Sequence, residues 1–408
     1  MVSFLVLFSS PKEKSMYKER TSKEKKMVVN FDRDTLINAL IPATFAVAGK
    51  NTMATLESVH LVCTEDGKCK IETQDLEKGF RTFIIADVIE EGDILINANK
   101  LLQIIKVMPA GDIKISVTDN LTARIESGAS HFDIKAIAGD QFPPLPELRG
   151  DRGFVIKQSM LRKFVNRVYF AIGQNDARPV FNGAFFHITD DKMLIVACDG
   201  NRLAYCEKEI ALENKNSSGM SLNLRFIVPG KVLSDIIKMT KDTDEPIDIR
   251  LTRRYIIFTF GEYMYLAKMI DTEYIDYNRI LPQNNKIITY LDSATLRSAL
   301  ERSSLIVEDR LAGSIRAYVK FIVEGENLQV STTSANGNVF DTIPVRREDD
   351  GQITIGFNCK FMLDALKVCD DCEIKMSYDN PLRGVLIEPQ DKEDAIYKYF
   401  VMPIRMNS

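Results

Sequence analysis

Short stretches of alternating hydrophobic and polar residues recur along the chain, and between them apolar residues return every three or four positions. Residues 192–197 and 255–260 show the alternating pattern, which is typical of strands with one buried face. Segments centred on Leu36, Leu161 and Leu296 show the second pattern, which is typical of amphipathic helices. Because both patterns occur throughout the sequence, we predict a fold of class α+β.

A second helical pattern occurs three times, each time with a lysine near its start. The leading lysines are Lys100, Lys231 and Lys360, at intervals of about 130 residues. Each copy lies between two strand-like runs; these runs are 94–96, 113–115, 226–228, 249–251, 353–355 and 374–376. The interval is too long for a solenoid repeat and matches a whole domain. We therefore predict three similar domains, each with two helices packed on antiparallel sheets.

Proline-containing segments separate the three copies. Residues 141–146 and 281–285 cannot continue a central strand or helix, because proline removes a backbone donor. The predicted domains are therefore 27–150, 151–284 and 285–408.

The first 26 residues differ from the rest of the chain. An apolar run at residues 2–8 precedes a basic stretch, and the segment holds seven Lys or Arg against three Glu. A secretory signal has the opposite order, with its charge before the apolar run. We predict that residues 1–26 are a non-native or disordered leader and that translation naturally starts at Met27. The alternative is a genuine basic tail or anchor.

Composition narrows the class of protein. With 408 residues, 45% of them hydrophobic and 27% charged, the chain has enough apolar material for several cores. No stretch approaches the ~20 apolar residues of a membrane span, so we expect a cytoplasmic protein without membrane partners. Seven cysteines, an odd number, favour a reducing compartment. Since the whole chain carries −4 and the leader +4, the remainder carries −8.

Basic residues nevertheless gather on the predicted helices. The polar faces are predicted to hold Lys100, Gln103 and Lys106 in the first copy, Lys231, Ser234, Asp235, Lys238 and Lys241 in the second, Lys360, Asp364 and Lys367 in the third, and Arg162, Lys163, Asn166 and Arg167 on the helix near Ser159. One such face is usually only solvated. Three copies in an acidic chain favour a shared positive surface that contacts phosphates without reading bases.

Enzymatic chemistry finds little support in the sequence. Cys369 and Cys372 form a Cys-x-x-Cys pair, but a structural zinc needs four ligands, and two intervening acids disfavour a thiolate. Neither a Walker loop nor a Gly-x-Ser-x-Gly elbow occurs. We expect no catalytic residues, cofactor or metal. Two alternatives stay open at this point: a phosphoryl or thiol enzyme built from repeated domains, and a scaffold that does not form a ring.

Four motifs resemble those of one known family. They lie at residues 197–204 (ACDGNRLA), 276–282 (DYNRILP), 399–405 (YFVMPIR) and 175–183 (NDARPVFNG). Together with the threefold repeat, they are similar to the bacterial sliding clamp, the beta subunit of DNA polymerase III, from Met27 to the end of the chain. The resemblance implies the DNA clamp fold and a homodimeric ring that encircles duplex DNA as a non-catalytic processivity factor. It also implies several partners: the polymerase III catalytic subunit, a clamp loader, and other polymerases and repair proteins that bind through short apolar peptides.

The resemblance also implies functional residues. A partner-peptide pocket would be lined by Arg178, Phe181, Cys198, Gly200, Asn201, Arg202, Leu203, Ile275, Arg279, Ile280, Val401, Met402, Pro403, Ile404 and Arg405. DNA contacts would come from Lys50, Lys100, Asn175, Arg178 and Lys231. The dimer interface would join Leu305 and Ile306 to the first domain near Ile134. Three departures from the family pattern leave the pocket's fine specificity open, namely Ile275, Asn201 and the pair Pro179-Val180.

Overall fold

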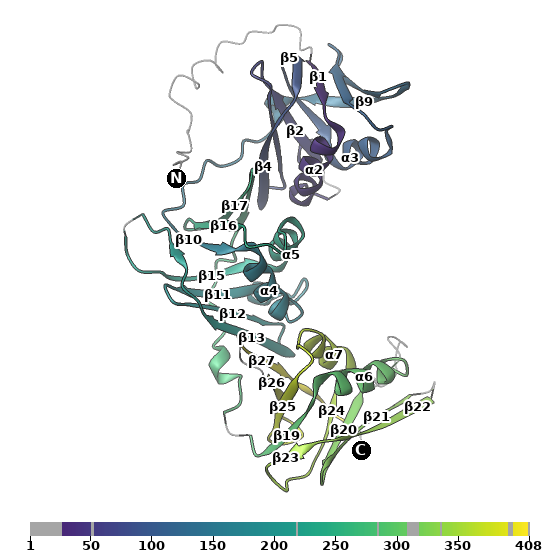
Figure 1. Ribbon diagram of the computed structural model, residues 1–408, viewed down its shortest axis with the longest axis vertical. Coiled ribbons are helices and arrows are strands. Elements are labelled where there is room, and N and C mark those ends of the chain that lie inside the picture. The colour runs from purple at the N-terminus through teal and green to yellow at the C-terminus, as the bar shows by residue number, and fades with distance from the viewer. Residues whose placement is uncertain are drawn as a thin grey trace. The chain divides into compact units, whose positions relative to one another are not determined.

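Both kinds of predicted helical segment are helices in the computed structural model, which describes residues 27–49, 53–217, 219–283, 285–307, 318–334, 337–390 and 395–406 (Figure 1). Each predicted domain contributes a pair. The pairs are α2 (Arg33–Ala43) with α3 (Ala98–Val107), α4 (Gln158–Tyr169) with α5 (Gly230–Met239), and α6 (Ser293–Ser304) with α7 (Cys359–Lys367). The threefold helical repeat predicted from the sequence is thus confirmed.

Side-chain caps explain where four of these helices begin. Asp32 accepts a hydrogen bond from the Thr35 N–H at 2.8 Å, and Asp292 accepts the equivalent bond from Thr295 at 2.7 Å. Asn97 and Asn358 cap α3 and α7 in the same way. Each cap satisfies one of the backbone donors that the first turn of a helix leaves without an internal partner.

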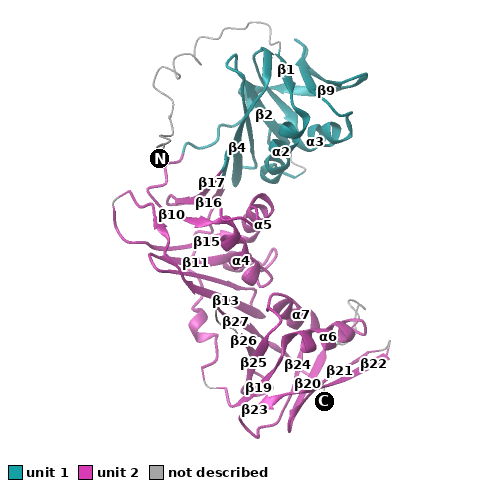
Figure 2. Ribbon diagram, viewed as in Figure 1, with its two compact units in different colours: residues 1–147, 261–265 teal, residues 148–260, 266–408 magenta. Residues whose placement is uncertain are grey.

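The chain forms two compact units (Figure 2). The first comprises residues 1–147 and 261–265, and the second comprises residues 148–260 and 266–408. The three predicted domains therefore do not separate equally. The second and third lie together in the second unit, and the nine-stranded sheet contains strands of both.

The first unit is built on antiparallel strands that pack against α2 and α3. In hydrogen-bonded order they are β4 (Lys78–Ile85), β3 (Lys68–Gln74), β2 (Ser58–Cys63), β6 (Gly92–Asn97), β9 (Ser130–Ala138), β8 (Thr122–Ser127), β7 (Ile113–Val117), β1 (Met27–Phe31) and β5 (Asp87–Glu90). Leu36 of α2 and Ile105 of α3 are fully buried together with Ile115 of β7. The apolar faces of these helices and strands thus form the core, as the sequence pattern predicts.

The second unit contains three sheets. The first includes β14 (Glu213–Asn214), β10 (Arg152–Lys157), β16 (Pro246–Leu251) and β17 (Tyr255–Phe260). The next strand in sequence, β18 (Tyr263–Lys268), is divided between the two units after residue 265. The second has nine strands in the order β15 (Asn223–Pro229), β11 (Gly183–Thr189), β12 (Lys192–Cys198), β13 (Arg202–Glu209), β27 (Ile396–Val401), β26 (Val385–Pro389), β25 (Glu373–Tyr378), β19 (Ile287–Asp292) and β23 (Arg346–Arg347). The third has the order β22 (Gly337–Pro344), β21 (Asn327–Ser334), β20 (Val319–Glu324), β24 (Ile353–Phe357) and β28 (Pro403–Ile404).

A group of charges around the buried Glu72 links four strands of the first unit. Glu72 of β3 has a side chain only 4% exposed and pairs with Lys70 at 3.0 Å and with Arg81 at 2.5 Å. His60 of β2 lies beside it, with Nδ1 3.3 Å from the Glu72 carboxylate and Nε2 2.6 Å from Asp93. Burial alone would raise the pKa of Glu72, but the hydrogen bond from His60 and the charges of Lys70 and Arg81 lower it to about 2.

This carboxylate gives the first unit a specific dependence on pH. The lowered pKa means that ionised Glu72 stabilises the fold fully above pH 4.5, its ordinary pKa, and that the contribution is lost as the pH falls towards 2. We expect Glu72→Gln to reduce the free energy of unfolding by about 3 kcal/mol at pH 7, because Lys70 and Arg81 lose a buried partner. Denaturant unfolding at several pH values measures this. The matched control is Glu90→Gln on the exposed edge of β5, and equal losses in the two variants would contradict the assignment.

Candidate functional site

Pairing of β13 with β27 brings residues from the second and third predicted domains onto one surface. The register places Leu203 opposite Phe400 and Arg202 opposite Val401. Since side chains alternate along a strand, Leu203 and Phe400 face one side of the sheet, and Arg202 and Val401 face the other. The two sides have different contacts and are described in turn.

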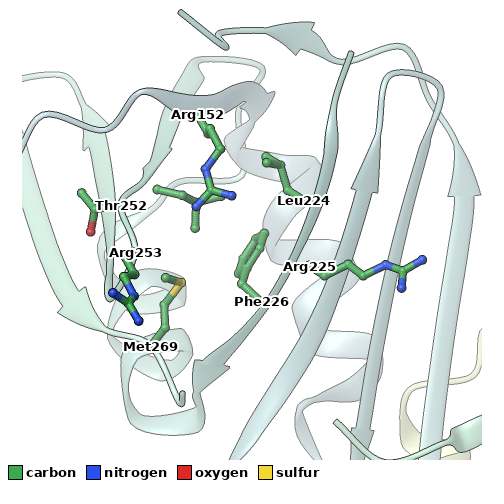
Figure 3. Close-up of a pocket in the computed structure, with 8 residues that line it drawn as sticks. Arg152, Leu224, Arg225, Phe226, Thr252, Arg253 and Met269 are labelled. Carbon is green, nitrogen blue, oxygen red and sulfur yellow. The ribbon is translucent and has the colours of Figure 1, made fainter. Parts of the chain in front are cut away.

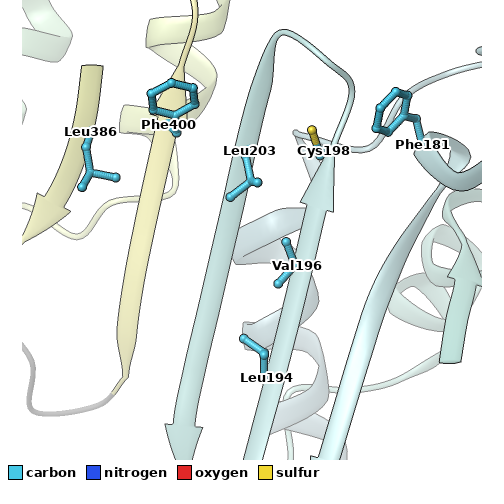
Figure 4. Close-up of a cluster of buried hydrophobic side chains, with 7 residues drawn as sticks. All are labelled: Phe181, Leu194, Val196, Cys198, Leu203, Leu386 and Phe400. Atoms are coloured by element: carbon cyan, nitrogen blue, oxygen red, sulfur yellow. The ribbon is translucent and has the colours of Figure 1, made fainter. Parts of the chain in front are cut away.

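The side that carries Leu203 and Phe400 is apolar across several strands. We call this group the sheet-face cluster; its buried members are Phe181, Leu194, Val196, Cys198, Leu203, Leu386 and Phe400 (Figure 4). An antiparallel sheet with a solvated face ordinarily presents polar side chains there. The apolar surface therefore indicates either a covering segment or a binding partner.

A connecting segment at residues 274–281 covers part of the cluster. Its half-buried apolar residues pack against the cluster; they are Tyr274, Ile275, Tyr277, Ile280 and Leu281. The Tyr274 ring stacks on Phe185 with centroids 5.1 Å apart, and its hydroxyl donates to the Val196 carbonyl at 3.2 Å. The segment is thus held by ring contacts and one hydrogen bond, and its exposed edge borders the cluster.

Several residues of the predicted pocket meet here. Phe181, Cys198 and Leu203 belong to the cluster, and Ile275 and Ile280 pack against it. At the margin, the Arg178 guanidinium lies 4.2 Å above the Phe181 ring and pairs with Asp176 at 3.0 Å. A Cβ on Gly200, which has φ of +88°, would come within 3.1 Å of that guanidinium. Glycine therefore lets Arg178 lie close over the turn.

Other residues of the predicted pocket lie apart from the cluster. Val401 is fully buried on the opposite side of the sheet. Met402 is exposed and its N–H bonds to the carbonyl of the exposed Asn201, while Pro403 and Ile404 form β28 against β24. Arg279 and Arg405 are exposed. The sequence reasoning missed Leu194, Val196, Leu386 and Phe400. Alternation along 396–401 would have assigned Phe400 to the face of Leu203 if the strand pairing had been known.

Arg202 has a structural position that the sequence did not indicate. The family resemblance implies that it lines the peptide pocket, but its side chain is 10% exposed and pairs with Asp199 at 2.9 Å and Asp364 of α7 at 2.8 Å. Its guanidinium also lies 4.4 Å from the Phe361 ring and 5.3 Å from the Phe170 ring. Burial alone would raise the pKa of Asp364, yet the hydrogen bonds from Arg202 and Lys360 lower it. Arg202 thus ties α7 to the turn between β12 and β13.

Arg167 makes a second link of the same kind and corrects the predicted basic face. It was expected on the polar face of α4, but it is 8% exposed. It pairs with Asp370 at 2.5 Å, donates to the Val368 carbonyl and lies 4.6 Å from the Tyr397 ring. Asp235, expected on the face of α5, is also buried. The exposed polar faces of α4 and α5 therefore contain fewer residues than predicted.

Most predicted DNA contacts lie on the surface. Lys100 and Lys231 are exposed in the first turns of α3 and α5. Asn175 is exposed and has φ of +56°, a conformation that asparagine tolerates better than most residues. Lys50 lies outside the described residues. Because Lys100 and Lys231 belong to different units, each is placed only within its own unit.

The predicted interface residues differ in exposure. Leu305, just after α6, is 81% exposed, and Ile306 is half-buried. Phe340 of β22, which packs beside α6, is also exposed. Ile134 is buried within the first unit, whereas Phe132, on the same side of β9, is exposed. In the first unit Phe132 is therefore the more available apolar contact.

The cysteines show no reactive arrangement. All seven are free thiols, and six are buried. In the Cys-x-x-Cys pair, burial raises the pKa of Cys369, which disfavours a thiolate. Among the described residues, no group of three or more potential metal-ligating side chains comes together. Within the same part of the chain, no helix has the length and apolar composition needed to cross a membrane.

Family models match the chain along most of its length. All three describe the DNA polymerase III beta subunit. Its N-terminal domain matches residues 27–146, its central domain residues 155–276, and its C-terminal domain residues 278–405.

Individual relatives agree with the family models. The beta sliding clamp of Staphylococcus epidermidis is 26% identical over 388 residues, covering 93% of this chain and 99% of the relative. The solved beta subunit of DNA polymerase III from Thermotoga maritima has a TM-score of 0.82 at 26% identity and covers 93% of this chain and 100% of its own. A putative beta subunit structure from Eubacterium rectale, 24% identical with the same coverage, has a TM-score of 0.84 and supports the fold.

The buried contacts of Arg202 predict a large effect on stability. Arg202→Ala leaves Asp199 and Asp364 without their shared partner, and we expect the free energy of unfolding to fall by about 3 kcal/mol. Denaturant unfolding checks this. The control is Arg279→Ala, whose side chain is 86% exposed and pairs with Asp276 at 2.9 Å; its loss should stay below about 1 kcal/mol. A loss for Arg202→Ala as small as the control's would show that Arg202 does not hold α7 in place.

Proposed function

The chain belongs to the family of bacterial DNA polymerase III beta subunits, the sliding clamps, and from this premise we propose that two copies close into a ring around duplex DNA. As a member of this family it is a non-catalytic processivity factor of DNA polymerase III. The enzyme alternative is thereby set aside. We propose that it acts in the cytoplasm. A closed ring stays on the DNA that it encloses, because it can be released only after the ring opens.

The observation that carries the DNA-binding proposal is the position of the repeated lysines. Lys100, Lys231 and Lys360 each lie in the first turn of a helix, and none of these turns contains an acid. A cation there opposes the helix dipole, at a cost of about 0.3–1 kcal/mol per lysine. The first turn of a helix ordinarily favours acidic residues, and all three helices depart from this preference at equivalent positions. This repeated departure indicates that the positive charge has a function.

Phosphate binding is the function that fits these positions. Lysine and the positive end of a helix both attract phosphate oxygens, and neither reads a base. Lys360 pairs with Asp364 at 2.8 Å, so its charge is partly compensated. Among the described residues, no carboxylate pairs with Lys100 or Lys231, so these two lysines are the stronger candidates. We propose Asn175 and Arg178 as further DNA contacts. Weak contacts of this kind let a ring move along DNA while it stays closed.

For the ring closure, we propose that Leu305 and Ile306 of one copy pack against the first unit of the other, near Ile134. The exposure of Leu305 supports this, because a large apolar side chain is more stable when a partner covers it. Ile134 is buried and presents little apolar surface to the other copy. The exposed Phe132, also on β9, adds apolar surface at the same place. Phe340 enlarges the other side in the same way.

For partner binding, we propose that the sheet-face cluster and the edge of segment 274–281 hold the apolar anchors of a short extended peptide. The supporting observation is an apolar sheet face whose covering segment is itself only half-buried at Ile275 and Ile280. The polymerase III catalytic subunit, other polymerases, repair proteins and a clamp loader would bind there in turn. Phe400 and Phe181 favour aromatic or branched apolar anchors.

The DNA proposal predicts a change in salt dependence. Lys100→Glu with Lys231→Glu should weaken retention on circular duplex DNA and flatten the dependence of affinity on salt, because fewer counterions are released on binding. Filter or surface-retention assays over a salt series measure both quantities. The control is Lys114→Glu on the exposed face of β7. An unchanged salt slope in the double variant would mean that these lysines face solvent and not DNA.

A further inference from the structure

A groove of about 770 Å³ lies next to the sheet-face cluster in the second unit. It is lined by His187 of β11, Arg225 of β15 and the connection at residues 269–278. Phe185 and Tyr274 belong both to the groove and to the residues that pack against the cluster. Groove and cluster are therefore contiguous, so one extended ligand can occupy both.

Arginines without a carboxylate partner line this groove. Arg225, Arg253 and Arg254 are exposed, and none has a carboxylate within salt-bridge distance in the part of the chain that the structure describes. Carboxylates also line the groove, on the connection at Asp271, Glu273 and Asp276, and Asp276 already pairs with Arg279. The charged residues of the lining outside this connection are the three arginines. Guanidinium groups next to aromatic rings bind carboxylates well, because their planar fork matches both oxygens.

A smaller cavity of about 80 Å³ adjoins the groove and contains no acid in its lining (Figure 3). Arg152 and Arg253 border it, above an apolar floor that includes Leu224, Phe226 and Met269. The Arg225 side chain extends away from the other labelled residues (Figure 3), and Arg225 also lines the groove. The nearest carboxylate to Arg152 is that of Asp151, at 3.9 Å, and both side chains are more than half exposed. Arginines therefore line both the groove and the smaller cavity, and one strand contributes to both linings.

That strand, β15, is the edge of the nine-stranded sheet. The Ile227 carbonyl points outward, since it accepts from the Ile270 N–H at 3.0 Å, while Ile227 pairs with Phe185 on the inner side. Outward-pointing groups alternate along an edge strand, so the N–H and C=O of Arg225 point to the same free edge. An edge of this kind accepts the backbone of an extended peptide.

We propose that this edge and its arginines bind an acidic extended segment of the partner, continuous with the apolar anchors in the sheet-face cluster. The proposal rests on the peptide site under "Proposed function" and assigns it a second specificity element. The peptide backbone bonds to the edge at Arg225. Acidic side chains reach Arg225 and Arg254 in the groove, Arg152 at the smaller cavity, and Arg253, which borders both. The apolar floor and the backbone edge favour a peptide over nucleic acid, whose phosphates need neither.

Three synthetic peptides test the proposal with the full-length chain. The first carries leucine and phenylalanine anchors only, the second adds a run of glutamates at the N-terminal side, and the third adds it at the C-terminal side. We expect a glutamate extension on one side to tighten binding roughly three- to tenfold at low salt, as fluorescence anisotropy measures it. Arg225→Glu with Arg253→Glu should remove that gain and leave the affinity for the unextended peptide unchanged. Lys114→Glu, in the first unit, is the control for charge reversal away from the groove.

The outcomes separate the two levels of the proposal. If neither glutamate extension tightens binding to the native chain while the unextended peptide binds, the acidic subsite is wrong and the apolar peptide site stands. If no peptide binds at all, both fail. If the double variant keeps the gain, the arginines are not its source. Loss of duplex DNA retention in the double variant, with peptide binding intact, would assign the arginines to DNA and overturn the proposal.

Discussion

The functional surfaces of the second unit depend on one strand pairing, that of β13 with β27. It joins residues about 200 positions apart into one sheet and aligns Leu203 with Phe400, which creates the apolar face. A shift of β27 by one residue would turn Phe400 to the helix side and separate it from Leu203. Arg202 and Arg167 resist such a shift, because each links the second predicted domain to residues beside α7 through buried ion pairs and ring contacts.

Arginines and lysines have different functions in this chain. Arg167 and Arg202 are buried in ion pairs and stabilise the fold, whereas Arg225, Arg253 and Arg254 remain exposed beside a groove. Lysines occupy the first turns of the repeated helices, where they oppose the helix dipole. Average charge does not reveal this division. A chain with a net charge of −4 still has localised cationic surfaces, and their placement decides which polyanion or acidic peptide each one binds.

Local elements could be predicted from the sequence because their causes are local. The helices around Leu36, Leu161 and Leu296, and the strands at 192–197 and 255–260, follow from periodicity alone. The environment of Arg202 could not be predicted, since Asp364 and Phe361 are distant in sequence and meet it only through the fold. Phe400 was missed for the same reason. Arg167 and Asp235 were assigned to exposed faces because helical periodicity does not show what packs against a polar side chain.

The central claim is that the chain acts by enclosing DNA, so the most direct measurement is a particle image of the purified protein in parallel with the Leu305→Glu variant. The account predicts closed rings with a central hole for the native chain, with a mass of twice 46.2 kDa. For the variant it predicts single folded chains, because a charge on this exposed side chain disrupts the interface without disturbing a core. Native particles that remain single chains at every concentration would contradict the account. So would a Leu305→Glu variant that forms rings as stable as those of the native chain.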